Sequence, residues 1–124
     1  SCTKEEKDID TFHKIMNNSD HNINIYSYYK SAKTDSLLLV IEKEKEFHFK
    51  EMGTIGSNPF DKGDSLIIIY DDSIMIKHTR NIQQAASRSL MLDENWNGGK
   101  INEIEYRFEY IFTNDDYKEA LDNQ

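Results

Sequence analysis

Histidine is the residue type in this chain best suited to acid–base chemistry or metal binding, because its ordinary pKa lies close to neutral pH. The four histidines are His13, His21, His48 and His78. Their spacing matches neither a His-x-x-x-His pair nor a histidine–cysteine set that would hold zinc. His48 and His78 lie in stretches that favour β-strands and could meet across a sheet. A histidine on a strand is more often a surface or core residue than a ligand, so we predict no metal and no cofactor.

Two acidic pairs, Asp71-Asp72 and Asp93-Glu94, place carboxylates in predicted turns. Neither pair belongs to the run of alternating oxygen ligands with a glycine that forms a calcium-binding loop. We therefore expect solvated turn residues at both places.

Trp96 is the only tryptophan, and Glu94 and Asn95 directly precede it. An exposed aromatic ring beside a carboxylate and an amide can stack on a sugar ring or anchor a protein partner. Trp96, Asn95 and Glu94 are thus candidate contact residues for a ligand or partner. The alternative, which we favour, is that the indole folds back onto its own hairpin.

Ser65 belongs to the tetrapeptide Gly63-Asp64-Ser65-Leu66, which resembles the motif of a serine hydrolase family named after these four residues. In that family the serine follows a strand and opens a helix, and an Asp-x-x-His pair lies near the C-terminus. Here the apolar strand follows the serine, and the only Asp-x-x-His segment, Asp10 to His13, lies far upstream. A serine nucleophile needs a base within hydrogen-bonding reach. A small hydrolase is therefore the least favoured function, and we predict no catalytic residue.

Cys2 is the only cysteine, so it can form no disulfide within the chain. Ser1 is the small residue expected before a lipidated cysteine, and residues 3–8 are charged in the manner of a hydrated tether. In these features the chain resembles the mature region of small Gram-negative bacterial lipoproteins. That resemblance implies an acylated Cys2, a tether over residues 1–8 and one domain over residues 9–124. The alternative is that Cys2 is incidental.

The resemblance also implies a place in the cell envelope, as an outer-membrane lipoprotein. In some of these bacteria a lysine followed by two acidic residues directs the lipoprotein to the cell surface, and Lys4-Glu5-Glu6 is similar to that signal. Orientation towards the periplasm and display on the surface both stay open. Stable anchoring needs more than one acyl chain, which a lipoprotein cysteine normally carries.

The chain of 124 residues has a formal net charge of −8 and a sequence pI near 4.9. This acidity argues against nucleic acid, whose phosphates need a face of lysine and arginine. It suits solubility or a basic protein partner. An acidic immunity or inhibitor protein, with a contiguous carboxylate patch for a basic partner, is therefore a competing function. No apolar run approaches the roughly 20 residues that span a bilayer.

The chain is organised around the stretch Lys62–His78, in which two apolar runs rich in β-branched residues flank Asp71-Asp72. This pattern is typical of a β-hairpin with a tight turn. Because Leu66–Tyr70 is apolar at every position, it predicts a strand in the middle of a sheet. Leu37–Ile41 is a second unbroken apolar run and predicts another buried strand.

Shorter patterns complete the first two thirds of the chain. Residues 22–30 favour a strand, and their apolar alternation slips between Ile25 and Tyr26, which indicates a bulge. Residues 47–50 alternate like a half-exposed strand, and Arg88–Leu92 is predicted as a short one. Residues 7–16 fit a short amphipathic helix or a strand. A loop is expected over residues 52–61, and residues 80–87 fit either a loop or one helical turn.

The C-terminal part carries the best-patterned strand, Ile101–Phe112, which is expected to leave a hairpin turn at Asn97-Gly98-Gly99. Alternate residues of this strand form an aromatic face suited to covering a sandwich core. Thr113 is predicted to cap a short helix together with Asp116. The apolar stripe of that helix consists of Tyr117, Ala120 and Leu121.

These elements predict a mainly β fold: an antiparallel β-sandwich of about seven strands, Ig-like or Greek-key, with a short C-terminal helix and an optional N-terminal one. Residues 60–121 also resemble small β-sandwich lipoproteins of uncharacterised function. We expect a non-catalytic, membrane-tethered, extracytoplasmic domain that binds a protein or glycan and no nucleic acid.

Overall fold

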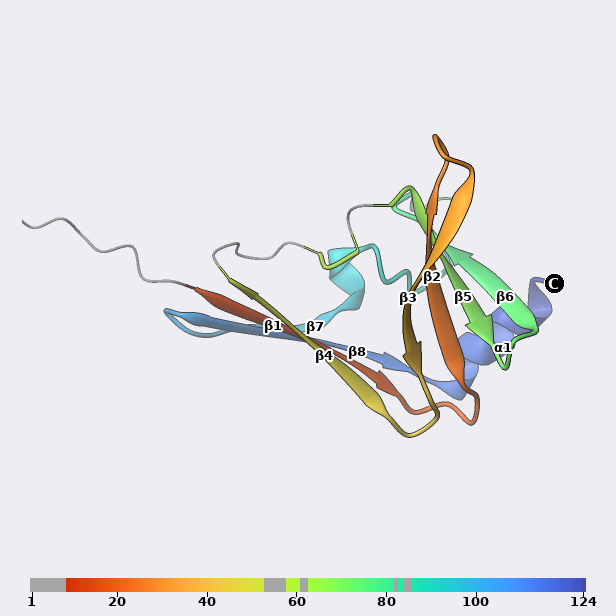
Figure 1. The fold of residues 1–124 in the computed structure, drawn as a ribbon. Coiled ribbons are helices and arrows are strands. Elements are labelled where there is room, and N and C mark those ends of the chain that lie inside the picture. Colours follow the sequence, from red (N-terminus) through yellow and green to blue (C-terminus); the bar gives the residue numbers. More distant parts are fainter. Residues whose placement is uncertain (1–8, 53–57, 61–62, 82, 84–85) are drawn as a thin grey trace, which may run out of the picture.

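The computed structural model describes residues 9–52, 58–60, 63–81, 83 and 86–124. The predicted tether, with Cys2 and Lys4-Glu5-Glu6, lies outside these residues, as does most of the loop expected over residues 52–61. The described strands form two four-stranded sheets, and a C-terminal helix packs beside them (Figure 1). The predicted mainly β sandwich with a C-terminal helix is confirmed, with eight strands in the described residues instead of about seven.

The first sheet, sheet A, has the strand order β4-β1-β8-β7. Its strands are β1 (Asp10–Asn17), β4 (Glu46–Met52), β7 (Asn97–Asn102) and β8 (Glu105–Phe112). β1 pairs antiparallel with β4 but parallel with β8, and His13 lies opposite Phe108. The segment that fitted either a helix or a strand is therefore a central strand of sheet A.

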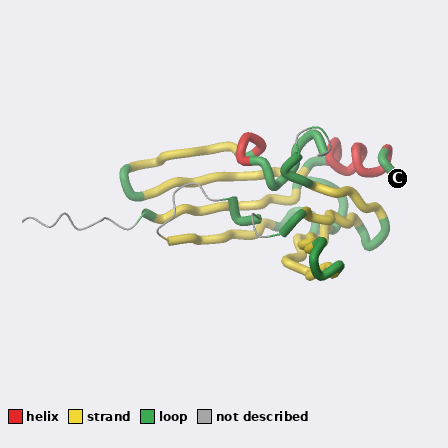
Figure 2. Tube along the Cα trace, turned by 90° about the horizontal axis from the view of Figure 1, so that it is seen from above, coloured by secondary structure: helices red, strands yellow, loops and turns green. Residues whose placement is uncertain are grey.

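The second sheet, sheet B, has the order β3-β2-β5-β6 and is antiparallel throughout. Its strands are β2 (Ile23–Tyr29), β3 (Thr34–Ile41), β5 (Ser65–Tyr70) and β6 (Ile74–His78). In Figure 1 sheet A runs across the view and sheet B stands upright against one end of it. Figure 2 shows the same crossing from above, with the helix α1 (Asn114–Asp122) at that end.

The β5–β6 hairpin forms as the sequence predicts. Asp71 and Asp72 have φ angles of +49° and +59°, the left-handed conformations of a two-residue turn that suits the twist of paired strands. β5 lies between β2 and β6, and Ile68 and Tyr70 are fully buried. The predicted bulge is confirmed too, because the β2–β3 register shifts between Ile25 and Tyr26.

The start of α1 also follows its sequence signal. The backbone N–H of Thr113 donates to Asp116 Oδ2 at 2.8 Å, which is half of the predicted reciprocal cap. Arg88 donates to the same oxygen at 2.5 Å and so connects the segment before β7 with the helix. Ala120 of the predicted stripe is fully buried, whereas Leu121 is exposed.

The core lies between the two sheets and becomes aromatic towards α1. Tyr70, Tyr110 and Phe112 are fully buried, and the rings of Tyr110 and Phe112 meet edge to face at 4.8 Å. Burial raises the pKa of the Tyr70 hydroxyl well above its ordinary value, and burial raises the pKa of Tyr110 in the same way. Both hydroxyls therefore stay protonated, and that of Tyr110 donates a hydrogen bond to the carbonyl of Arg88 at 2.5 Å.

The strand predicted over Leu37–Ile41 is confirmed but its predicted burial is wrong, and the strand predicted over Arg88–Leu92 is wrong. Leu37–Ile41 lies in β3, which is an edge strand, and only Leu39 and Ile41 are buried there. Arg88–Leu92 forms turns instead of a strand, although Leu90 and Met91 are buried. In both cases the apolar composition correctly indicates that some of the residues are buried. It does not show which neighbouring strands, if any, the segment pairs with.

The predicted turn at Asn97-Gly98-Gly99 is also wrong, because these residues begin β7 and the chain turns at residues 103 and 104. Gly98 and Gly99 have φ angles of +125° and +155°. A Cβ on Gly98 would lie 2.1 Å from the carbonyl oxygen of Arg107. Glycine is required here by the close approach of β8.

Candidate functional site

Ser65, the nucleophile of the hydrolase alternative, begins β5 and is buried. Its Oγ has no hydrogen-bond partner among the described residues. A nucleophilic serine would need a base at that oxygen. Ser65 is therefore a buried strand residue, and no described side chain is placed to act as its base.

His48 and His78 do not meet, because they lie in different sheets. His48 is exposed, and its Nε2 contacts Glu46 Oε1 at 3.1 Å. His78 is buried and accepts the backbone N–H of Leu90 on Nδ1 at 3.0 Å. Burial lowers the pKa of His78 to about 3, with a smaller contribution from the charge of Arg88. The described residues contain no group of three or more histidine, cysteine, aspartate or glutamate side chains suited to hold a metal ion.

Trp96 lies in the core, with only 7% of its surface exposed. Its Nε1 donates to the carbonyl of Leu90 at 2.9 Å, and its ring packs against Tyr110 of the following hairpin and His13 of β1. Trp96 is therefore not an exposed ring that could contact a sugar or a partner. The indole folds back onto its own hairpin, which is the alternative favoured from the sequence. Asn95 bonds to the carbonyl of Ser89, and Glu94 alone is exposed.

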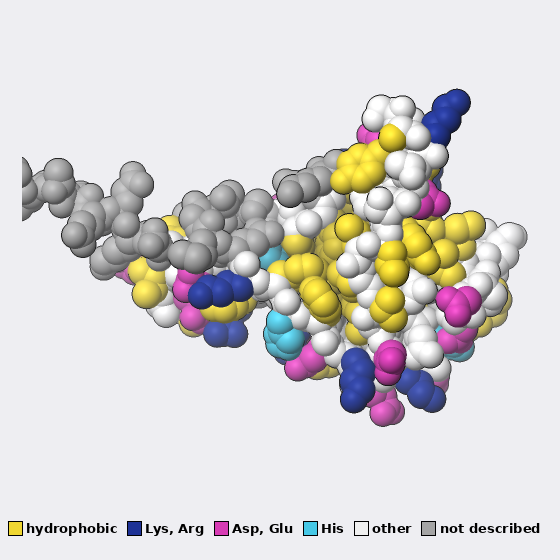
Figure 3. Space-filling view, viewed as in Figure 1, with side chains coloured by type: hydrophobic (Ala, Val, Ile, Leu, Met, Phe, Trp, Pro, Cys, Tyr) yellow, Lys and Arg dark blue, Asp and Glu magenta, His cyan; other side chains and the backbone are white. Residues whose placement is uncertain are grey.

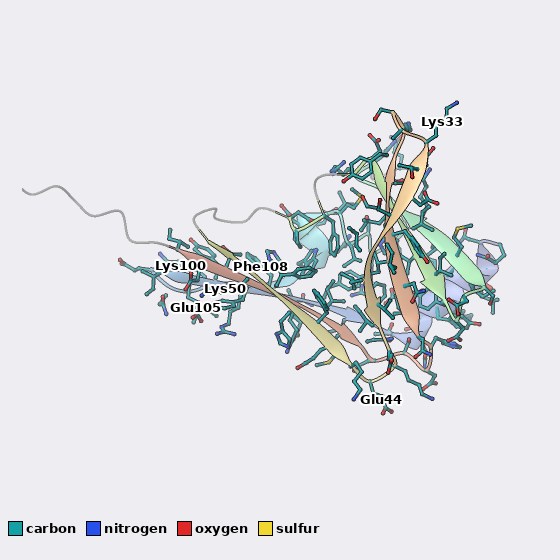
Figure 4. The ribbon with its side chains drawn as sticks, in the orientation of Figure 1. Lys33, Glu44, Lys50, Lys100, Glu105 and Phe108 are labelled. Atoms are coloured by element: carbon teal, nitrogen blue, oxygen red, sulfur yellow. The ribbon has the colours of Figure 1, made fainter. Side chains whose placement is uncertain are left out.

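The outward side chains of sheet A form a surface that we call the charged face. Its members are Asp10, Phe12, Lys14, Glu46, His48, Lys50, Glu105, Arg107 and Glu109. Opposite charges are paired across it: Lys14 Nζ–Glu109 Oε2 at 2.9 Å, Arg107 Nε–Glu105 Oε2 at 2.7 Å and Lys50 Nζ–Asp10 Oδ2 at 3.8 Å. Figure 4 shows Lys50 and Glu105 in the half of sheet A that extends beyond sheet B.

The outward side chains of sheet B are mainly apolar, and we call this surface the apolar face. Its apolar members are Tyr26, Leu37, Leu38, Val40, Ile67, Ile69 and Met75, and the polar side chains of Asn24 and Lys77 share the face. The exposed fraction is 53% for Leu37, 46% for Leu38, 50% for Val40 and 52% for Met75. In Figure 3 hydrophobic side chains gather over the strands of sheet B, and charged ones collect at the turns below. Soluble monomers rarely leave a contiguous apolar surface uncovered, so the apolar face is a candidate interaction surface.

The edge of sheet B adds to this surface. Within the described ranges β3 pairs with β2 alone, so its other edge carries backbone groups that no strand uses. Its eight residues include neither proline nor lysine, which are the usual means of blocking an edge. Leu38 is the extra residue at the β2–β3 bulge and stands at this edge. A partner strand could therefore pair with β3 and bury the apolar face at the same time.

One end of the apolar face opens into a polar hollow of about 440 Å³, which we call the acidic hollow. It is lined by Asn22, Asn24, Val40, Glu42, Asp71 and Asp72. Asp71 Oδ2 lies 2.5 Å from His21 Nδ1, and its other oxygen accepts the backbone N–H of Asn22. Both contacts, the histidine first, lower the pKa of Asp71 below its ordinary value. The carboxylate of Asp71 in this hollow thus stays ionised in mildly acidic solution.

A scan against protein-family models found no match, and neither did searches of the curated proteins and of the solved structures. None of the helices in the described ranges is long and apolar enough to cross a bilayer. The chemistry of the described surfaces is therefore the basis for a functional proposal. The unbroken apolar run Leu37–Ile41 predicts a buried strand, and only the pairing of β3 with a single neighbour reveals that this strand is exposed.

Proposed function

We propose that this chain is a non-catalytic binding domain, held at the cell envelope by a lipid on Cys2, that binds a protein partner through the apolar face. The observation that carries the proposal is the exposure of Leu37, Leu38, Val40 and Met75 on one side of sheet B. Burying such side chains in an interface is favourable by about 25 cal/mol per Å² of apolar surface. A partner is the simplest way to remove them from water.

The proposed partner contributes an extended strand that pairs with the open edge of β3. Backbone hydrogen bonds would supply orientation, and apolar side chains on alternate positions of the partner strand would cover Val40 and Leu37. This mode uses both unusual properties of β3, its unblocked edge and its exposed apolar residues.

Site-specific photocrosslinking in cells that express the full-length gene tests this interface. A photoreactive residue at Val40 is expected to yield a discrete protein adduct, and the same residue at Lys14 on the charged face serves as the matched control. Adducts of equal yield at both positions, or none at Val40, would remove the apolar face as the binding surface.

The anchor is tested separately in the same cells. The wild-type protein is expected in the membrane fraction with an acylated N-terminal cysteine by mass spectrometry, and the Cys2→Ala variant in the soluble fraction. An unacylated wild-type protein in the soluble fraction would disprove the anchor and leave the interface proposal to be judged on its own.

A second candidate function, an acidic immunity or inhibitor protein, is favoured by the acidic hollow. Glu42, Asp71 and Asp72 would face a basic group of the partner there. Association through these carboxylates should weaken with added salt, since exposed charges are screened. A complex that Glu42→Gln and Asp72→Asn leave unchanged would exclude this candidate.

A further inference from the structure

A small hollow lies between sheet A and the short helix η1 (Asp93–Asn95), on the opposite side of sheet A from the charged face. Its volume is about 220 Å³, and its walls are His13, Asp93, Trp96 and Phe108, so we call it the aromatic hollow. Parallel pairing of β1 with β8 sets His13 beside Phe108. In Figure 4 the Phe108 side chain points from β8 towards the segment that carries η1.

The three rings form a fixed frame. The imidazole of His13 stacks on Phe108 with centroids 5.2 Å apart and meets Trp96 edge to face at 5.0 Å. Trp96 is held in addition by its hydrogen bond to Leu90. Aromatic faces carry partial negative charge and attract a cation that lies against them. The frame therefore exists before any ligand arrives, which reduces the entropic cost of binding.

Asp93 adds a full negative charge to this frame. Its Oδ1 accepts a hydrogen bond from Asn58 Nδ2 at 3.0 Å, and the same amide donates to the carbonyl of Leu90 at 2.9 Å. None of the ion pairs among the described residues includes Asp93. The carboxylate is thus positioned by an amide, while its charge is left for a ligand.

We propose that the aromatic hollow binds a flat cationic group, a guanidinium or amidinium such as the head of an arginine side chain. A planar cation can lie against a ring while its N–H groups donate to the Asp93 carboxylate. The volume suits one such group.

The single tryptophan makes this proposal directly testable, because fluorescence excited at the long-wavelength edge, where the seven tyrosines absorb little, reports on Trp96 alone. Benzamidine, a planar cation, is titrated into the intact protein, and benzamide, its neutral analogue of the same shape, is the ligand control. Benzamidine is expected to change the emission in a saturable way, with benzamide at least tenfold weaker. Equal responses to both compounds, or no saturable response to benzamidine, would overturn the proposal without any variant.

Two neighbouring carboxylates provide the matched variants. Asp93→Asn keeps an oxygen that can accept from Asn58 but removes the charge, and it is expected to weaken benzamidine binding about tenfold. Glu94→Gln, one residue along η1, removes an equal charge outside the hollow and should change binding less than twofold. Equal losses in both variants would mean that only the overall charge matters, and an unchanged Asp93→Asn would exclude the site. This outcome is independent of the apolar face, which lies on sheet B.

Discussion

The outer faces of the two sheets differ sharply, although both are built from four strands. On the charged face of sheet A, basic and acidic side chains alternate across neighbouring strands and pair, as Lys14 does with Glu109. On the apolar face of sheet B, leucine, valine and methionine take the equivalent outward positions. The side chains of the charged face are paired and hydrated, whereas those of the apolar face expose hydrocarbon to water. This difference is the reason for proposing sheet B, and not sheet A, as the binding surface.

The contrast between the two faces points to a partner only if the apolar face contributes little to the free energy of folding. Substitutions at adjacent residues of β3 test this contribution. Leu39→Ala, on the buried side, should lower the free energy of unfolding by about 2–5 kcal/mol because it leaves a cavity. Leu38→Ala, at the exposed edge, should change it by only about 0.5 kcal/mol. Urea unfolding of the isolated protein measures both values.

A large loss of stability from Leu38→Ala would mean that the exposed residues serve the fold itself. The apolar face would then need no partner to explain it, and the contrast between the sheets would lose its functional meaning.

A second prediction compares a buried histidine of sheet B with an exposed one of sheet A. His78 has a folded-state pKa of about 3 and an unfolded value near 6.5. Between these two pKa values the unfolded chain binds a proton that the folded chain excludes. The contribution of His78 to stability is therefore complete well above pH 6.5 and is lost progressively as the pH is lowered. The loss attributable to His78 should be about 2 kcal/mol from pH 7 to pH 5.

Urea unfolding at both pH values should show a smaller pH dependence for His78→Gln than for the wild type. His48→Gln, on the charged face, is the control and should retain the wild-type dependence. If His48→Gln alone flattens the pH profile, the assignment of the titrating group to the interior is wrong.

The smallest expected effect concerns the ion pairs of the charged face. A double-mutant cycle with Lys14→Met and Glu109→Gln should give a coupling energy of about 0.5 kcal/mol, since partly exposed pairs gain little in water. The coupling should decrease at high salt. A coupling of several kcal/mol that persists in salt would show that this face, too, has a structural role beyond solvation.

Local signals in the sequence were sufficient where a few neighbouring residues define the structure. Asp71-Asp72 specified a tight turn between two apolar runs, and Thr113 with Asp116 specified the start of α1. The slip between Ile25 and Tyr26 marked a real bulge. Each of these patterns has its physical cause within about four residues, so the sequence alone contains the needed information.

Other features depend on strands that meet only in the folded chain. The run Leu37–Ile41 is as apolar as a central strand, and nothing within it shows that β3 has a neighbour on one side only. Gly98 is required by the approach of Arg107 within β7–β8 and not by a turn. The aromatic hollow needs His13 beside Phe108, which parallel pairing of β1 and β8 creates across nearly the whole chain.

That parallel pair has a consequence for the order of folding. A hairpin such as β5–β6 can form as soon as its two strands have been synthesised. The pair of β1 and β8 can form only after nearly the whole chain has been synthesised. Contacts between such distant segments are slow to form. β1 can pair with β4 while the ribosome is still producing the second half of the chain, but sheet A is completed only when β8 has emerged.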